Sequence, residues 1–344
     1  MACRQTVQPA PAPTLPAAPA PSLAVLAPGL AAVAAVTAAV LLLARWTGQP
    51  PTLMALLVGL VLNRFTGAPR LAPGLAFAAR TLLRWGIVLV GARVTLSEVA
   101  ALGPQTLAAV VAIIALTLSA GFVAARALGF SKAFGVLAGG AVAICGASAS
   151  AALVGVLGER IRRHEFAIVL VVVALWSAIA QAAFPLLARA LGFSDEQAGF
   201  MLGASVHDVA QAIGAGYAFS VAAGKVATIV KLARVAMLAP MLALVSLAFP
   251  GERSAASRVP ILPWFIVGFL LTAAANSAGL VPRSMGEPVQ ALATGLLAAA
   301  IAAVAMRAPL KDVRSAGAKP LLAIGAASVA ALALSCAAAV ALYR

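Results

Sequence analysis

The sequence contains little charge and few acids. Charged residues make up 10% of its 344 residues, only nine are Asp or Glu, and there are two histidines. A soluble protein needs about 25% charged residues to cover its surface. This scarcity excludes a soluble globular domain, and the lack of alternating segments of about ten residues excludes a β-barrel. The remaining fold class is an all-α polytopic membrane protein.

Cysteine is also rare, and nucleotide-binding motifs are absent. The three cysteines (Cys3, Cys145 and Cys336) are too scattered for a disulfide framework or a zinc site. No Walker motif, Gly-rich dinucleotide motif, nucleophile–base pair or metal-binding cluster occurs. We therefore expect no cofactor, no metal and no enzyme activity. An ATP-driven pump would need a separate motor subunit.

Positive charge is in excess, with a net charge of +15. The Lys and Arg residues stand singly or in small groups between apolar runs, rather than in one patch. Basic residues in such positions set membrane topology and contact anionic lipid. We therefore expect membrane lipid as a partner and no nucleic acid.

Apolar runs near the length of a membrane span recur along almost the whole chain. The Pro/Ala-rich residues 1–28 precede them, and we predict a disordered tail there rather than a signal peptide. Residues 29–344 are then a single transmembrane domain with about 9–11 transmembrane segments. The predicted segments are 29–46, 52–65, 73–93, 104–126, 133–158, 164–189, 197–219, 224–249, 260–278, 285–306 and 318–342.

Segments 133–158 and 197–219 are unlike the others, because Gly and small polar residues crowd their centres. Both contain Gly-Ala-Ser, starting at Gly146 and at Gly203. One interpretation is close helix packing. The other is a pair of broken or re-entrant helices whose turns meet at a midplane site, as in inverted-repeat transporters. If both segments turn back, residues 160–163 ("RIRR") fall inside, as the positive-inside rule favours.

An internal echo also indicates inverted repeats. "GARVTLSEVAALGPQTL" resembles "AMRAPLKDVRSAGAKPL", which aligns Arg93 with Arg307 and Glu98 with Asp312. Chance similarity between two amphipathic junctions is the alternative. Repeats of this kind are typical of secondary transporters.

The stretch "GASVHDVAQAIGAG" places His207, Asp208 and Gln211 in an apolar surrounding. An ionisable residue inside a membrane segment is costly unless it is paired or wetted, so it is a functional candidate by default. We predict that His207 and Asp208 exchange protons. The structural alternative is that Asp208 only caps its helix or pairs with a neighbouring one.

Two cations in "ATIVKLARVAMLAP", Lys231 and Arg234, lie three residues apart. They could snorkel to a membrane face, or Lys231 could neutralise Asp208. A Lys/Arg pair within a bundle is also what an anion pathway needs. The loop "AICGASAS" adds serines and the N–H groups of a half-helix, which attract anions. The predicted substrate-binding residues are Gly146, Ser148, Ser150, Gly203, Ser205, Gln211, Lys231 and Arg234.

A set of motifs carries a family resemblance: "ICGASASAAL", "GASVHDVAQAIGAG", "IVKLARVAMLAP", "ILPWF" and "AGAKPLL". Together they resemble the YeiH-type family of bacterial inner-membrane proteins, which are labelled sulfate exporters. The resemblance runs from about Pro28 to the C-terminus. That family is grouped with the cation/proton antiporter and bile-acid-transporter-like superfamily, which implies inverted repeats and broken, crossing helices. Its members often carry His-Glu where this chain has His207 and Asp208.

The expected function is secondary active transport of a small anion. We expect a multi-pass inner-membrane protein that exports sulfate or a sulfonate, with protons or sodium as the coupling ion. A cation/proton antiporter using Asp208 is one open alternative, and a channel or non-transporting membrane protein is another. A homodimer is also left open.

Overall fold

The chain is helical throughout the computed structural model, which describes residues 22–249, 263–308 and 317–343, and these residues contain no strand. Seven helical stretches among them are long and apolar enough to cross a membrane. They are α1 (Leu23–Thr47), α3 (Ala72–Phe77) joined through a π-helical turn to α4 (Leu83–Gly91), α6 (Gly103–Ala127), α9 (Arg163–Ala190), α12 (Val221–Ala236) continued by α13 (Leu238–Ala248), α15 (Gly286–Met306) and α17 (Ala318–Leu342).

Three shorter apolar helices accompany these seven: α2 (Pro51–Leu62, extended by a 3-10 turn to Phe65), Lys132–Ala143 and α14 (Trp264–Ser277). Lys132–Ala143 belongs to a hairpin described below, so α2 and α14 bring the candidate crossings in the described part of the chain to nine. A short helix, α5 (Leu96–Ala101), links α4 to α6 and is held by a capping box of Thr95 and Glu98. These elements confirm the all-α polytopic class.

Helix α1 begins earlier than the sequence predicted. The tail was expected to reach residue 28, but the chain is helical from Leu23, and residues 1–21 lie outside the described part. Pro28 removes one hydrogen bond inside α1. The next residue, Gly29, packs closely against the start of α3, because a Cβ on it would lie 2.4 Å from the oxygen of Leu71.

Both unusual segments form helical hairpins. Hairpin 1 consists of α7 (Lys132–Ala143) and α8 (Ala147–Leu157), and hairpin 2 of α10 (Asp195–Ser205) and α11 (Val209–Phe219). We call residues 144–146 and 206–208, where the hairpins turn, tip 1 and tip 2.

The arms of each hairpin lie side by side. In hairpin 1, a Cβ on Gly140 would lie 2.7 Å from Cδ1 of Leu153 on the other arm. In hairpin 2, the hydroxyl of Ser220 donates to Oδ1 of Asp195 at 2.6 Å and joins the two open ends. Each segment therefore returns to the end from which it started, as a re-entrant helix does.

The two hairpins enter from opposite ends of the long span formed by α12 and α13. Gly199 and Gly216 of hairpin 2 approach the oxygen of Ala223, near the start of this span. Gly140 of hairpin 1 approaches Met241, in its second half. The tips consequently meet near the middle of the span, which confirms the prediction of two broken or re-entrant helices.

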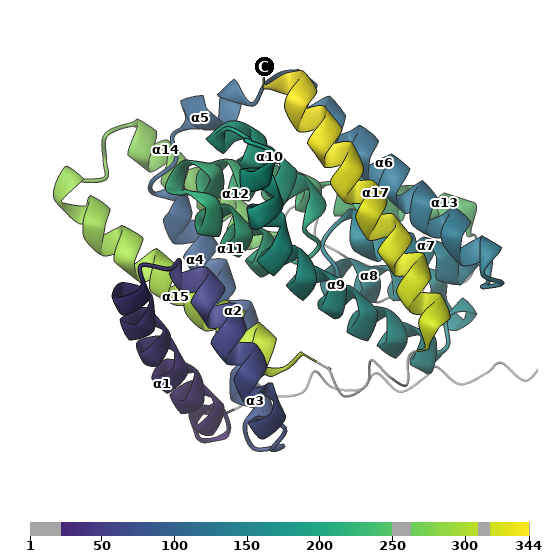
Figure 1. The fold of residues 1–344 in the computed structure, drawn as a ribbon, viewed down its shortest axis with the longest axis horizontal. Helices are drawn as coiled ribbons and strands as arrows, with labels where there is room; N and C mark the ends of the chain where they lie inside the picture. The colour runs from purple at the N-terminus through teal and green to yellow at the C-terminus, as the bar shows by residue number, and fades with distance from the viewer. Residues whose placement is uncertain (1–21, 250–262, 309–316, 344) are drawn as a thin grey trace, which may run out of the picture.

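The helices pack in two groups (Figure 1). The core bundle comprises α6 to α13 and α17, and the lateral bundle comprises α1 to α4, α14 and α15. Contacts within each group dominate, and α11 supplies the main contacts between them, against α2 and α15. Hairpin 2 therefore lies at the boundary between the bundles.

Helices α4 and α15 pack antiparallel, since Arg93 donates to Gln290 while Gly86 faces Leu297. This places Arg93 and Arg307 at opposite ends of the pair, as inverted repeats require. Asp312, the predicted counterpart of Glu98, lies outside the described residues.

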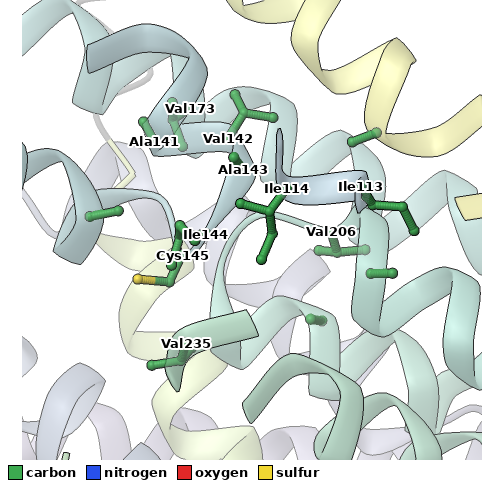
Figure 2. Close-up of a cluster of buried hydrophobic side chains, with 14 of the residues drawn as sticks. Ile113, Ile114, Ala141, Val142, Ala143, Ile144, Cys145, Val173, Val206 and Val235 are labelled. Carbon is green, nitrogen blue, oxygen red and sulfur yellow. The ribbon is translucent and has the colours of Figure 1, made fainter. Parts of the chain in front are cut away.

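Tip 1 is embedded in apolar side chains. Figure 2 shows Ile144 and Cys145 with Ile114 of α6, Val173 of α9 and Val206 of tip 2, all of them buried. This packing fixes the position of both tips.

Candidate functional site

Lys231 joins the two tips. Its side chain is fully buried, and Nζ donates to the carbonyl oxygens of Ile144 at 2.8 Å, Val206 at 2.7 Å and His207 at 2.6 Å. An ammonium has three N–H donors, and all three are used here. A buried cation is tolerated when its donors are satisfied in this way.

Arg234 makes a second connection between the hairpins, and it is also fully buried. Nε and Nη2 donate to the oxygen of Ala143 at 3.1 and 2.6 Å, and Nη2 also donates to Val142 at 3.0 Å. Nη1 donates to the oxygen of Ala204. The guanidinium thus lies at the C-terminal ends of α7 and α10, where the helix dipoles favour positive charge.

The contacts of Lys231 and Arg234 determine which of their groups a bound anion would meet. Their donors are directed at backbone carbonyls, so their charge, rather than a direct hydrogen bond, is what an anion at the tips would encounter. Direct contact of either side chain with substrate stays a prediction.

The N-terminus of α8 is open. Gly146 has φ +65°, a conformation that disfavours any side chain, and it turns the chain into α8. No side chain caps this helix, and Ala147 and Ser148 are exposed. No hydrogen bond joins the Ser148 hydroxyl to another described residue. The first N–H groups of a helix lack partners within it, so this end can bind an anion.

The N-terminus of α11 carries its own carboxylate. Oδ1 of Asp208 accepts a hydrogen bond from the Gln211 amide at 3.2 Å and caps the helix. The Asp208 amide donates to the hydroxyl of Ser177 on α9 at 2.9 Å. Asp208 is partly exposed. The two hairpins are therefore alike in shape, but only hairpin 2 has an acid at this position.

His207 faces a different helix from Asp208. It is fully buried, and its Nε2 lies 2.8 Å from the hydroxyl oxygen of Ser328 on α17. That hydroxyl donates to the oxygen of Ile324, which assigns the donor role to Nε2–H of His207. Nδ1 has no hydrogen-bond partner among the described residues. The two neighbouring side chains thus make different contacts, and proton exchange by them stays a prediction.

Two buried glutamines, one on α9 and one on α11, have unpartnered oxygens. Oε1 of Gln181 and Oε1 of Gln211 are buried and accept no hydrogen bond from the described residues. The orientation of the Gln181 amide is fixed because Nε2 donates to the oxygen of Thr52 at 3.3 Å. The Thr52 hydroxyl in turn donates to Gly214 at 2.9 Å and links α2 to hairpin 2. An unsatisfied buried acceptor costs about 1–3 kcal/mol of folding free energy. These two oxygens are therefore candidates to bind a group that enters the site.

The remaining predicted residues have structural contacts. The hydroxyl of Ser150 donates to Gly146 at 2.9 Å, and that of Ser205 donates to Met201 at 2.6 Å, so both bond to their own helices. A Cβ on Gly203 would lie 2.6 Å from the oxygen of Ala227, so close packing requires glycine there.

The two Gly-Ala-Ser stretches are not equivalent, contrary to the prediction that both form the meeting turns. The stretch at Gly146 leads into α8, whereas the one at Gly203 ends α10, three residues before Val206. Helix α10 continues through it because Ala204 and Ser205 sustain the helical hydrogen bonds. The turn of hairpin 2 therefore falls at 206–208.

Four polar residues that the sequence analysis did not select lie beside the site: Thr52, Ser177, Gln181 and Ser328. A signal was present in "ALWSAIAQAAF", where Ser177 and Gln181 share one face of an otherwise apolar span. Polar residues within an apolar span are thus candidates for a site, as charged residues are.

The chain matches the family described as conserved hypothetical protein 698 over residues 28–324. It is 43% identical to UPF0324 membrane protein TauZ of Paracoccus denitrificans, over 84% of this chain and 88% of the relative. It is 37% identical to UPF0324 membrane protein CT0845 of Chlorobaculum tepidum, over 86% of this chain and 84% of the relative. No solved structure matches the chain. The chain belongs to the conserved hypothetical protein 698 family of UPF0324 membrane proteins, which confirms the family resemblance seen in its motifs.

Proposed function

We propose that this protein is a secondary active transporter that exports a small anion, such as sulfate or a sulfonate, across the bacterial inner membrane. One observation carries the proposal. The N-terminus of α8 is uncapped and exposed at Ser148, at the depth where the tips meet, while the corresponding end of α11 is capped by Asp208. A substrate anion at α8 would take the position that Asp208 takes at α11.

The charges around the tips support an anion. Lys231 and Arg234 carry two positive charges, and Asp208 carries one negative charge. The α8 N-terminus adds partial positive charge. In a buried site such charges are screened weakly, so an anion there is attracted strongly.

The packing of the hairpins supports alternating access. On α8, the residues Ala147, Ser148 and Ala151 are exposed, whereas α11 is covered by α2 and α15 of the lateral bundle. The hairpins enter from opposite ends, so the two ends of the site differ in access. Transporters with inverted repeats exchange such states by moving one bundle against the other.

His207 and Asp208 are proposed to serve coupling separately. Nδ1 of His207 is an unpartnered base that can take up a proton, and the partly exposed Asp208 carboxylate can take up a proton or a cation.

Transport assays on proteoliposomes test the proposal. Labelled sulfate and a labelled sulfonate are loaded, and efflux is followed with and without a pH gradient. The variant Ser148→Trp fills the exposed end of α8, and we expect it to lower efflux about tenfold or more. Ser246→Trp, on an exposed face of α13, is the matched control and should keep wild-type efflux. No efflux of any anion by the wild type, or equal efflux by both variants, contradicts the proposal.

Cation/proton antiport is the second candidate, favoured by the partly exposed carboxylate of Asp208. It predicts sodium-driven proton movement in the same liposomes without any anion. That movement should be lost in Asp208→Asn and kept in Ser148→Trp.

A further inference from the structure

We propose that Asp208, Gln181 and Gln211 form a binding site for one sodium ion on hairpin 2, apart from the anion position on α8. Only its linkage to transport rests on the proposed function.

The first observation is the pair of unpartnered amide oxygens. Oε1 of Gln181 and Oε1 of Gln211 belong to side chains only 1% and 3% exposed, and neither accepts a hydrogen bond from the described residues. The amide of Gln181 is oriented by its bond to Thr52, so the unpartnered atom is the oxygen and not the nitrogen. Two buried oxygens without a partner indicate that a hydrogen-bond donor or a cation occupies the space beside them.

The second observation is that these groups lie on one continuous set of contacts. Ser177 binds the Asp208 amide at 2.9 Å, and Gln181 follows it by one helical turn on α9. Gln211 lies one turn after Asp208 on α11, and its backbone N–H donates to the carboxylate. Further along α11, a Cβ on Gly214 would lie 2.8 Å from Nε2 of Gln181. Along α11, Gln211 lies between Asp208 and Gly214, which both contact α9. The three proposed ligand residues thus belong to one short stretch where α11 runs beside α9.

The chemistry of these groups selects a monovalent metal ion. A proton on Asp208 could satisfy only one acceptor, whereas a metal ion binds several oxygens at once. The set supplies one carboxylate and neutral oxygens, which balance a single positive charge. A divalent ion would leave excess positive charge near Lys231, whose Nζ is bound to the oxygen of His207.

The charges also link this site to the anion. Lys231, Arg234 and Asp208 together leave one positive charge at the tips, and a bound sodium ion raises it to two. A divalent anion such as sulfate then neutralises the set. Sodium and sulfate should therefore each raise the affinity for the other, by the same factor.

Thermal unfolding of the purified protein in detergent tests the site. NaCl is replaced stepwise by choline chloride or KCl at constant ionic strength, with no sulfate present. We expect a saturable rise of about 4 °C in the unfolding temperature with sodium, and a smaller one with potassium. Asp208→Asn keeps an oxygen that can cap α11. In this variant, the sodium concentration that gives half of the rise in unfolding temperature should be at least tenfold higher. Gln211→Leu should raise the required sodium concentration by a similar factor. If Gln211→Leu does not fold, Gln181→Leu replaces it in the test.

Thr117→Val is the matched control, because Thr117 on α6 also has a buried unpartnered oxygen. It should keep the full sodium response. Equal unfolding temperatures in sodium and choline would overturn the proposal, as would a sodium response unchanged in Asp208→Asn. If sodium raised the unfolding temperature but no anion efflux occurred, the sodium site would stand and the proposed function would be rejected. If efflux occurred without a sodium response, the proposed function would stand and the sodium site would be rejected.

Discussion

Lys231 and Arg234 lie three residues apart on α12, and each donates hydrogen bonds to carbonyl oxygens of both hairpins. The hairpins are therefore tied to one another through a single turn of a third helix.

We predict that Lys231→Met lowers the free energy of unfolding on the order of 3–5 kcal/mol. Methionine fills a similar volume but leaves the oxygens of Ile144, Val206 and His207 without their donor. Lys225→Met is the control, because Lys225 is a partly exposed member of an ion pair and its loss should cost about 1 kcal/mol or less. Chemical denaturation in mixed micelles measures both. Similar losses for the two variants would contradict the role given to Lys231.

The hairpins predict a specific pattern of accessibility to a membrane-impermeant thiol reagent. In a cysteine-free background, cysteines at Lys132 and Glu159 flank hairpin 1, and cysteines at Glu196 and Ala222 flank hairpin 2. We expect the first two to react from one side of the membrane and the last two from the other. If 132 and 159 reacted from opposite sides, the segment would span the membrane and the hairpin would be wrong.

Ser328 is expected to stabilise the buried imidazole of His207. In Ser328→Ala, Nε2–H loses its acceptor and both ring nitrogens are left unpartnered, at a cost of about 1–3 kcal/mol. Ser335→Ala removes a buried hydroxyl on the same helix that has no partner among the described residues, so it should cost less. Comparing the two unfolding temperatures in detergent checks this. A larger loss in Ser335→Ala would refute it.

The ion pair of Glu98 and Lys225, 2.9 Å apart, should contribute a small pH-dependent stability. Partial burial raises the pKa of Glu98, but hydrogen bonds from the Thr95 amide and the Lys225 side chain outweigh it, so the pKa lies below 4.5. Because the folded-state pKa is lowered, the contribution is complete above 4.5 and is lost as the pH falls through the lowered value. Glu98→Gln should remove this dependence and cost about 1 kcal/mol or less at neutral pH. Denaturation at pH 7 and pH 3.5 measures it, and an equal pH dependence in the variant would contradict it.

Composition and breakers were enough to locate the spans, because lipid requires long apolar helices whose limits are set by Gly, Pro and charge. The crowding of Gly around Gly146 and Gly203 was enough to single out the two hairpins. The partners of Lys231 were not predictable in the same way. Its acceptor at Ile144 is 87 residues away, and only tertiary packing fixes which carbonyls it meets. Equally, no local pattern shows that the His207 side chain contacts α17 while the Asp208 backbone amide contacts α9.

The separation of 87 residues in sequence between Ile144 and Lys231 has a consequence for biosynthesis. Hairpin 1 leaves the ribosome well before α12, so the terminal carbonyls of α7 must wait in the bilayer or its insertion machinery without their counter-charges. A re-entrant segment with bare carbonyls is poorly soluble in lipid. Hairpin 1 should therefore settle into place only after α12 has been inserted. Chains truncated before residue 231 should leave it exposed to proteases and quality control.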